Sequence, residues 1–271
     1  MAKDFIRIGS IHIRWYSIIL MIAVIFAYLI ICKEAKKKTA KDDLIINTLF
    51  YGLLFGILGA RIYFVLFNMN YYINNPLEIF MIWNGGLAIH GGILFGLLFL
   101  IIYSKKNNIN LLLLLDLIIP GLIIAQAIGR WGNFFNQEAY GRVVSLSFLK
   151  KLYLPNFIIQ NMYIDGHYRE PTFLYESFFS FLGFIVIVLL RKNNNLKVGQ
   201  LTGLYLIWYG IERLIIETFR SDSLMFSNIK IAQLISIIFI ISGVFLYIKN
   251  RKRAFYNNEV LQKGEQKCIK K

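Results

Sequence analysis

Long runs of apolar residues constrain this chain more than any other feature of its sequence. Each run is about as long as the ~20 residues that a helix needs to cross the ~30 Å hydrocarbon core of a bilayer. The runs are continuously apolar rather than alternating, which favours helices over the strands of a membrane barrel. The seven predicted spans are Trp15–Cys32, Leu44–Phe67, Gly86–Tyr103, Leu111–Ile128, Thr172–Leu190, Leu201–Thr218 and Ile229–Ile248.

The composition also points to lipid as the solvent. Hydrophobic residues make up 57% of the 271 residues and charged residues only 17%, whereas soluble domains contain roughly 45–50% and 25%. Backbone polar groups must be satisfied internally in a bilayer, so only helices or closed barrels can span it. We therefore predict an all-α integral membrane protein, with residues 1–271 forming a single polytopic domain.

The distribution of basic residues predicts the orientation in the membrane. The first, third and fifth connections and the C-terminal tail, residues 249–271, are rich in lysine and arginine, while the connection from Asn68 to Gly85 has neither. The positive-inside rule then places the odd connections and the C-terminus in the cytoplasm and the N-terminus outside. These segments explain the net charge of +15. No nucleic-acid partner is predicted, because no basic stripe is interleaved with aromatic residues on a soluble face.

The connection between the fourth and fifth spans is longer than the others. It covers residues 129–171 and contains aromatic residues, Pro155 and several basic residues. Loops longer than about 12–15 residues are usually functional. We predict that this segment forms a small extracytoplasmic arm or head, with short helices or strands of its own.

The first part of this connection, Gly129 to Gly141, places charge where lipid is expected. It carries Arg130, Asn133, Asn136 and Glu138. A charged group within a bilayer costs roughly 3 kcal/mol on insertion scales, so such groups are rarely kept without a function. The flanking glycines allow the backbone to approach a ligand closely. This segment is therefore a candidate functional site.

A second polar cluster lies on the sixth predicted span. Tyr209, Arg213, Glu217 and Arg220 follow one another at helical spacing and share one face. Arg213 and Glu217 are one turn apart, and their pairing could simply lock two helices together. Arg220 lies near the outer end and could extend to the interface. The alternative is an anionic ligand, which is favoured because two arginines face one carboxylate.

A third cluster surrounds His90, where the third predicted span begins. Glycine pairs stand on both sides of this histidine, at Gly85-Gly86 and Gly91-Gly92. His90 could be a core residue that is hydrogen-bonded to a neighbouring helix. It could also be a proton acceptor, since the proton affinity of imidazole suits neutral pH.

Arg61, in the second predicted span, is a further intramembrane cation. Asp116 and Glu176 are possible partners for Arg61 or for Arg130, and the sequence does not assign these pairs. The histidines and cysteines are scattered and match no metal-ligand spacing, so no metal site is predicted.

Six motifs, in order along the chain, resemble the prolipoprotein diacylglyceryl transferase family, the first enzymes of bacterial lipoprotein maturation. The resemblance covers nearly the whole chain, and six motifs in register are far more specific than one. The matching segments are Trp15-Tyr16, Gly59-x-Arg61, Gly85-Gly86-x-x-x-His90-Gly91-Gly92, Gly129-Arg130-x-Gly132-Asn133-Phe134-x-Asn136-x-Glu138-x-x-Gly141, Pro171-x-x-x-Tyr175-Glu176 and Tyr209-Gly210-x-x-Arg213-x-x-x-Glu217-x-x-Arg220.

The resemblance implies a fold, a location and a reaction. It implies seven transmembrane helices and an outer arm in the bacterial cytoplasmic (inner) membrane. Members of the family move the diacylglyceryl group of phosphatidylglycerol to the lipobox cysteine thiol in the signal peptide of a preprolipoprotein. A thioether forms and glycerol-1-phosphate leaves. The implied partners are phosphatidylglycerol, the lipobox peptide and membrane lipid, and no cofactor is implied.

The resemblance also implies roles for individual residues. Arginine suits a phosphate leaving group, because its fork binds phosphate bidentately and stays charged. His90, Arg130 and Arg213 are the implied catalytic residues, with His90 accepting the thiol proton. The implied phosphatidylglycerol-binding residues are Tyr16, Arg61, Arg130, Asn133, Asn136, Glu138, Gly141, Tyr209, Glu217 and Arg220.

Three points stay open at this stage. Glu170-Pro171 stands where many members of the family have His-Pro, so the role of that position is in doubt. A carboxylate such as Glu217, or bulk water, could accept the thiol proton in place of His90. The alternative function is secondary transport of an anionic substrate, although transporters usually show paired halves and no repeat is evident here.

Overall fold

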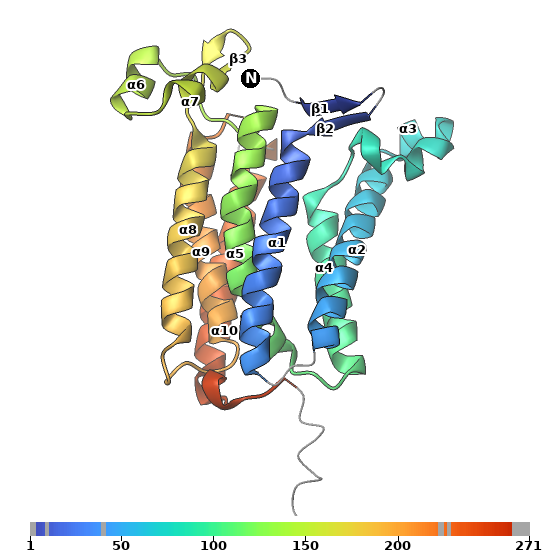
Figure 1. Cartoon of the computed structure of the whole chain (residues 1–271), viewed down its shortest axis with the longest axis vertical. Coiled ribbons are helices and arrows are strands. Elements are labelled where there is room, and N and C mark those ends of the chain that lie inside the picture. Colours follow the sequence, from blue (N-terminus) through green and yellow to red (C-terminus); the bar gives the residue numbers. More distant parts are fainter. Residues whose placement is uncertain (1–3, 9–10, 39–41, 222–224, 227–228, 262–271) are drawn as a thin grey trace, which may run out of the picture. The chain divides into compact units, whose positions relative to one another are not determined.

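The computed structural model describes residues 4–8, 11–38, 42–221, 225–226 and 229–261. The described chain is mostly helical (Figure 1). It divides into two compact units. The larger unit comprises residues 1–31 and 115–259, and the smaller unit comprises residues 32–114 and 260–271. Residues 262–271 of the predicted basic tail lie outside the described residues.

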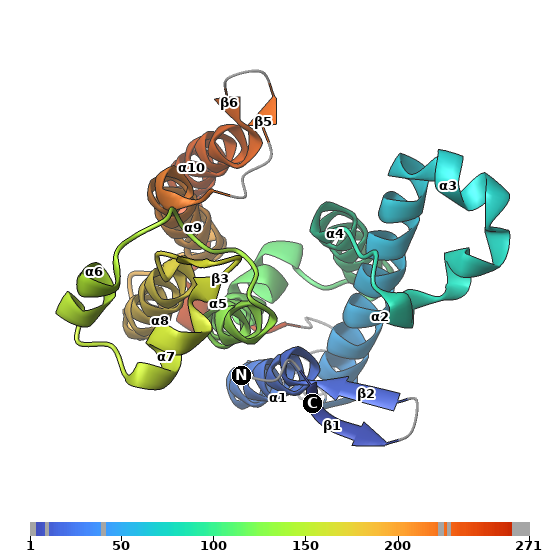
Figure 2. The same cartoon turned by 90° about the horizontal axis from the view of Figure 1, so that it is seen from above.

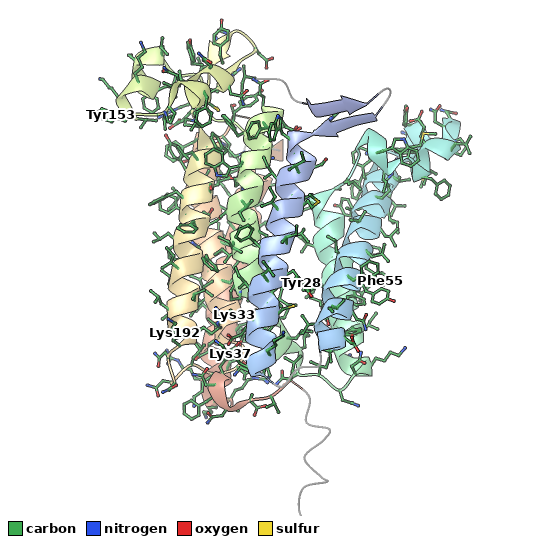
Figure 3. The ribbon with its side chains drawn as sticks, viewed as in Figure 1. Tyr28, Lys33, Lys37, Phe55, Tyr153 and Lys192 are labelled. Atoms are coloured by element: carbon green, nitrogen blue, oxygen red, sulfur yellow. The ribbon has the colours of Figure 1, made fainter. Side chains whose placement is uncertain are left out.

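Six helices in the described chain are long and apolar enough to cross a bilayer. Many of their apolar side chains are exposed, as is Phe55 on α2 (Figure 3). Continuous apolar surface of this kind requires lipid rather than water around it. The prediction of a helical integral membrane protein is therefore confirmed. The six helices are α1 (Trp15–Lys37), α2 (Asp42–Phe67), α4 (Ile89–Lys106), α5 (Leu111–Asn136), α8 (Thr172–Arg191) and α10 (Ile231–Lys249).

The sixth predicted span is also a helix, α9 (Gln200–Phe219), but it does not belong to this apolar set. It carries Glu212, Arg213 and Glu217, and the two glutamates are buried within the protein. The polar face of α9 therefore packs against other parts of the larger unit. That α9 crosses the membrane stays a prediction.

Three short antiparallel hairpins accompany the helices in the described residues. Each strand has at most five residues, too few for alternation to stand out beside the apolar runs of the helices. The pairs are β1 (Asp4–Ile8) with β2 (Ile11–Arg14), β3 (Tyr163–Ile164) with β4 (His167–Tyr168), and β5 (Met225–Phe226) with β6 (Ile229–Lys230).

In the larger unit, α5, α8, α9 and α10 lie side by side (Figure 2). Glycines let α9 and α10 approach closely. A Cβ atom on Gly203 would lie 2.7 Å from the carbonyl oxygen of Gly243, and one on Gly243 would lie 2.6 Å from that of Gly203. Small residues at helix contacts are typical of membrane proteins. The pair α9–α10 is therefore held at one fixed spacing.

Asp116 of α5 holds the beginning of α9. Its carboxylate accepts hydrogen bonds from the backbone N–H of Gly199 (2.5 Å) and from the backbone N–H (2.8 Å) and hydroxyl (2.6 Å) of Thr202. The first N–H groups of a helix have no intrahelical partner, so Asp116 caps α9. The carboxylate of Asp116 thus binds Gly199 and Thr202. The sequence analysis had considered it as a partner for Arg61 or Arg130.

Between α5 and α8 the chain forms a small head. It contains α6 (Leu146–Lys151), α7 (Asn156–Asn161) and the hairpin β3–β4, gathered at one end of α5 and α8 (Figure 1). The head has its own apolar core, in which Leu149, Ile158 and Met162 pack with Phe134 of α5 and Phe173 of α8. The predicted short helices and strands are present, and this core fixes the head to the two helices.

The smaller unit is built on the pair α2 and α4. Gly59 and Gly91 face each other at the contact, because a Cβ atom on Gly91 would lie 2.3 Å from the carbonyl oxygen of Gly59. The connection between the two helices contains α3 (Met69–Asn74) and the 3₁₀ turns η1 (Pro76–Phe80) and η2 (Ile82–Asn84). Helix α4 begins at Ile89, three residues later than the predicted span.

The described chain ends after two further 3₁₀ turns, η3 (Asn250–Lys252) and η4 (Tyr256–Asn258). Tyr256 is fully buried, and its backbone N–H donates to the carbonyl of Leu196 over 2.7 Å. This bond attaches the end of the larger unit to the α8–α9 connection. Lys192 begins that connection, at the end of α8 remote from the head (Figure 3).

Candidate functional site

The polar segment 129–141 begins inside a helix that continues past residue 128, where the predicted span ends. Helix α5 continues through Arg130 and Asn133 to Asn136. It ends where Gln137 takes the left-handed conformation, with φ +56°. Gln137 N–H donates to the carbonyl of Phe134 and Glu138 N–H to that of Asn133, which are the bonds of a Schellman cap. The helix therefore holds the first polar residues of the segment in fixed directions.

The beginning of α1 packs on this part of α5. The ring of Trp15 stacks on Phe135 at 5.3 Å between centroids. Tyr16 lies against Gly132, where a Cβ atom would come within 2.7 Å of the tyrosine Cδ2. Glycine at 132 thus makes room for an aromatic ring rather than for a turn. Tyr16 therefore lies against the polar segment. The sequence analysis names Tyr16 and residues of this segment together as binding residues.

Glu176 of α8 is the centre of the charged cluster. Its Oε2 atom lies 2.6 Å from Nε of Arg130, and its Oε1 atom lies 2.8 Å from Nη1 of Arg213 and 3.8 Å from Nη1 of Arg220. One carboxylate therefore joins three helix segments that are distant in sequence. The sequence offered Glu176 as one of two possible partners for Arg130, and the structure selects it.

A second carboxylate, Glu217, completes the cluster. Its Oε2 atom lies 2.8 Å from Nη2 of Arg213, and this ion pair confirms the pairing expected from their helical spacing. Arg130, Arg213 and Arg220 thus surround the carboxylate of Glu176, and Arg213 also contacts Glu217. The side chains of Arg130, Arg213 and Arg220 are 22%, 19% and 12% exposed, whereas the two carboxylates are at most 2% exposed. The accessible part of the cluster is therefore cationic.

Lys230 adds a cation that the sequence analysis did not identify. Its Nζ atom donates to the backbone carbonyls of Glu217 (2.6 Å) and Arg220 (2.9 Å). These are carbonyls at the C-terminal end of α9, where positive charge is favourable. The partners of Lys230 are backbone carbonyls, which every residue has. No sequence pattern could therefore have identified this lysine as part of the cluster.

Gly141 lies beside the cluster through backbone contacts. It forms an isolated bridge with Arg220, and its carbonyl accepts a hydrogen bond of 3.1 Å from the Ser221 hydroxyl. A Cβ atom at this position would lie 2.8 Å from Cβ of Glu170. The end of the polar segment is thus attached to the end of α9. This contact brings the two predicted polar clusters together.

Other predicted binding residues have more local contacts. Asn136 Nδ2 donates to Glu138 Oε1 at 3.4 Å, just beyond the end of α5. The Tyr209 ring stacks with Tyr205 at 6.0 Å between centroids and lies tilted against Phe239 at 5.9 Å. The expectation that Tyr209 orients Arg213 therefore stays a prediction, while its ring helps to pack α9 against α10.

Glu170 has a clear structural partner. Its carboxylate accepts a hydrogen bond of 2.9 Å from Nε of Arg142, and the Tyr175 hydroxyl approaches the other oxygen at 3.4 Å. Glu170 itself is buried. At this position the chain therefore has an ion pair that joins the head to the beginning of α8.

His90 and Arg61 both belong to the smaller unit. His90 is an exposed residue in the first turn of α4, with its ring 6.2 Å from that of Tyr63. Arg61 is only 7% exposed, and its guanidinium donates to backbone carbonyls of the α2–α4 connection. Within the described residues, no group of three or more His, Cys, Asp or Glu side chains could hold a metal ion.

Fold and site together define an integral membrane protein with a partly exposed arginine cluster suited to an anionic group. The chain matches the profile of the prolipoprotein diacylglyceryl transferase family over residues 3–249 and belongs to that family. It is 50% identical over 246 residues to the phosphatidylglycerol–prolipoprotein diacylglyceryl transferase of Staphylococcus xylosus, covering 90% of this chain and 88% of the relative.

Relatives with the same name come from other bacteria. The protein of Streptococcus mutans is 47% identical over 248 residues, covering 91% of this chain and 94% of the relative. The protein of Staphylococcus aureus strain MSSA476 is 47% identical over 246 residues, covering 90% and 88%. The match therefore extends over almost the full length of both partners in each comparison.

Proposed function

We propose that this protein transfers the diacylglyceryl group of phosphatidylglycerol to the lipobox cysteine thiol of prolipoproteins. The sulfur forms a thioether bond with the glycerol carbon of the diacylglyceryl group that is esterified to the phosphate. The carbon–oxygen bond of that ester breaks, and glycerol-1-phosphate leaves. The observation that carries this proposal is the arginine cluster around Glu176, in a chain that belongs to this enzyme family.

In this proposal Arg130 and Arg213 bind the lipid phosphate. Glu176 contacts Nε of Arg130 and Nη1 of Arg213, and Glu217 contacts Nη2 of Arg213. The N–H groups that do not point at these carboxylates bind the phosphate oxygens in this proposal. Arginine presents five donors in a rigid fork, so it can bind a carboxylate and a phosphate at once. Charge that develops on the departing oxygen is stabilised by groups already held in place, which is the most effective form of electrostatic catalysis.

The remaining residues of the predicted set surround the rest of the lipid. Asn133, Asn136 and Glu138 offer hydrogen bonds to the glycerol hydroxyls of the headgroup. We assign binding roles as well to the residues that border this segment and α9. These are Tyr16, Gly141, Tyr209, Glu217 and Arg220.

His90 is the proposed acceptor of the thiol proton. A thiol has an ordinary pKa near 8.5, and the thiolate is the nucleophile. A neutral imidazole can take the proton near pH 7. The test is a pH–rate profile of His90→Gln and His90→Asn beside the parent. Near-parental turnover by either stably inserted variant would exclude His90 and favour a carboxylate or water.

The proposed topology has seven membrane helices, including α9, in the bacterial cytoplasmic membrane. The N-terminus and the head are outside, and the basic connections and C-terminus are cytoplasmic. The head and Lys192 lie at opposite ends of α8 (Figure 3), as this orientation requires within the larger unit. Labelling of single cysteines placed at Lys105 and Lys192 tests it, and reaction with an impermeant reagent from outside would contradict it.

A direct assay distinguishes transfer from transport. Membranes that contain the protein are incubated with phosphatidylglycerol and a peptide carrying a lipobox cysteine, and the peptide is analysed by mass spectrometry. The proposal predicts a mass gain of one diacylglyceryl group on the cysteine and release of glycerol-1-phosphate. An unmodified peptide, with the parent protein folded and both substrates present, would contradict the proposal.

A further inference from the structure

Arg61 interacts with a different class of partner from the arginines around Glu176. Its Nε atom donates to the carbonyl of Ile79 over 2.9 Å, and its Nη1 atom donates to those of Gly85 (2.8 Å) and Gly86 (3.0 Å). Its Nη2 atom donates to the carbonyl of Glu78. One guanidinium therefore binds four backbone oxygens of the α2–α4 connection, and these bonds use four of its five N–H groups.

The glycines of this connection fit that arrangement. Gly85 and Gly86 have φ values of +90° and +74°, which non-glycine residues rarely adopt. A Cβ atom on Gly86 would lie 2.6 Å from Nη1 of Arg61, whereas one on Gly85 would meet open space. Glycine at 86 therefore allows the guanidinium to reach the backbone. Close approach of a ligand is not needed to explain this glycine pair.

The two residues of α2 that precede Arg61 also contact the beginning of α4. The N–H of Ala88, the residue before α4, donates to the carbonyl of Ala60 over 3.0 Å. Gly91 packs directly on Gly59. Three consecutive residues, Gly59, Ala60 and Arg61, thus hold the segment on both sides of His90.

We infer that Arg61 is a positioning residue, which clamps residues 78–86 and thereby sets the location of His90 at the beginning of α4. This inference rests on the proposed function, because it gives His90 a catalytic role. It replaces the phosphatidylglycerol-binding role that the sequence predicts for Arg61. A buried guanidinium that is already bonded to four carbonyls has little capacity left for a phosphate fork.

The alternative is a ligand site at the same place. Arg61 lines a cavity of about 400 Å³ together with Asn68, Tyr71, Tyr72 and Glu78. The Tyr71 hydroxyl donates to Glu78 Oε2 over 2.8 Å, and this hydrogen bond raises the pKa of the Tyr71 phenol above its ordinary value. A lipid headgroup bound here would use Arg61 directly. The experiment must therefore separate binding from positioning.

The test compares Arg61→Lys, Gly86→Ala and their double variant in the full-length protein. Lysine keeps the positive charge, but its single ammonium group cannot bond to four carbonyls as the guanidinium group does. In Gly86→Ala the added Cβ atom would lie 2.6 Å from Nη1 of Arg61 and would displace the guanidinium from the connection. We expect each single variant to lower kcat for transfer at least tenfold, with KM for phosphatidylglycerol changed less than about threefold. The double variant should be little worse than either single one, because both remove the same contact.

Hydrogen exchange of the backbone amides supplies a readout that does not depend on activity. Both single variants should raise exchange across residues 78–88, with α9 and α10 unchanged. Gly85→Ala is the matched control, since it introduces the same backbone strain with open space around Cβ, and it should perturb exchange less than Gly86→Ala. If Arg61→Lys yields no folded protein, Gly86→Ala displaces the same contact from the other side.

Two results would overturn the inference. One is a large rise in KM for phosphatidylglycerol at unchanged kcat, which would assign Arg61 to substrate binding. The other is parental exchange at residues 78–88 in both single variants. Absence of transfer by the parent protein would instead contradict the proposed function, while the exchange measurement would still decide whether Arg61 clamps the connection.

Discussion

The arginines of the larger unit and Arg61 of the smaller unit lie in opposite surroundings. Around Glu176, three guanidinium groups share two carboxylates, and each arginine keeps part of its side chain exposed. In the smaller unit, one guanidinium is divided among four neutral carbonyls and is almost fully buried. The first arrangement leaves positive charge accessible to an anion, while the second uses the charge to hold a connection together. An arginine within a membrane protein is therefore not by itself a ligand site.

The largest effect is expected at the charged cluster. Arg130→Ala and Arg213→Ala should each lower the rate of transfer by about 100-fold or more, the usual scale for losing one preorganised donor to a developing charge. Lysine at either position should recover little activity, because it lacks the fork. The measurement is turnover of a lipobox peptide by protein quantified after membrane insertion.

Arg253→Ala is the control for these variants. Arg253 is an exposed arginine just after η3, and its loss should leave turnover close to parental. Near-parental turnover of the lysine variants would show that a point charge is sufficient. Loss of folded protein along with activity in Arg130→Ala would favour a purely structural ion pair.

Removal of the central carboxylate should have the next largest effect. Glu176→Gln leaves the surrounding guanidinium groups without their shared partner, and breaking a buried ion pair from one side typically costs about 3–5 kcal/mol. We expect a clearly lower midpoint of thermal unfolding in detergent, together with reduced transfer. Asp165→Asn, at the exposed β3–β4 turn, is the control. An unchanged midpoint in Glu176→Gln would mean that the carboxylate does not organise the cluster.

The cap of α9 tests stability apart from binding. Asp116→Asn replaces one acceptor oxygen with an amide donor, opposite the N–H groups of Gly199 and Thr202. The expected loss of unfolding free energy is about 2 kcal/mol, the upper range for helix caps. KM for phosphatidylglycerol, measured well below the unfolding temperature, should stay parental. A marked rise in KM would show that Asp116 acts on the binding site.

The smallest effects are expected from a pair of glycines in α5. At Gly132, alanine would place Cβ 2.7 Å from Tyr16, while at Gly129 a Cβ atom meets open space. Overpacking of this kind costs roughly 1–3 kcal/mol, so Gly132→Ala should lower transfer several-fold. Gly129→Ala should leave transfer unchanged and stabilise the helix by up to about 1 kcal/mol. Equal activities for the two variants would remove Tyr16 from the site.

The sequence predicts the membrane helices well, because an apolar run of sufficient length is a local property. It fails at their ends. Hydropathy falls at Gly129, but α5 continues to Asn136 because packing against Tyr16 and the head holds its last turns in place. A change from apolar to polar residues marks a change of surroundings, which need not be the end of a helix.

The candidate site is predictable only where its contacts are local. The pair of Arg213 and Glu217 follows from helical spacing. The link from Arg130 to Glu176 joins two helices, and no pattern within either helix selects it. The partners of Arg61 are backbone carbonyls, which have no signature in the sequence. Side-chain motifs therefore identify the charged residues but not what each of them binds.

Binding of phosphatidylglycerol by the two kinds of arginine variant tests the central comparison most directly. Native mass spectrometry of the full-length protein, titrated with phosphatidylglycerol, would measure lipid occupancy in the parent, Arg213→Lys and Arg61→Lys. The account predicts that Arg213→Lys loses most of the bound lipid, while Arg61→Lys keeps nearly parental occupancy although its transfer rate falls. Retained binding in Arg213→Lys together with lost binding in Arg61→Lys would contradict it.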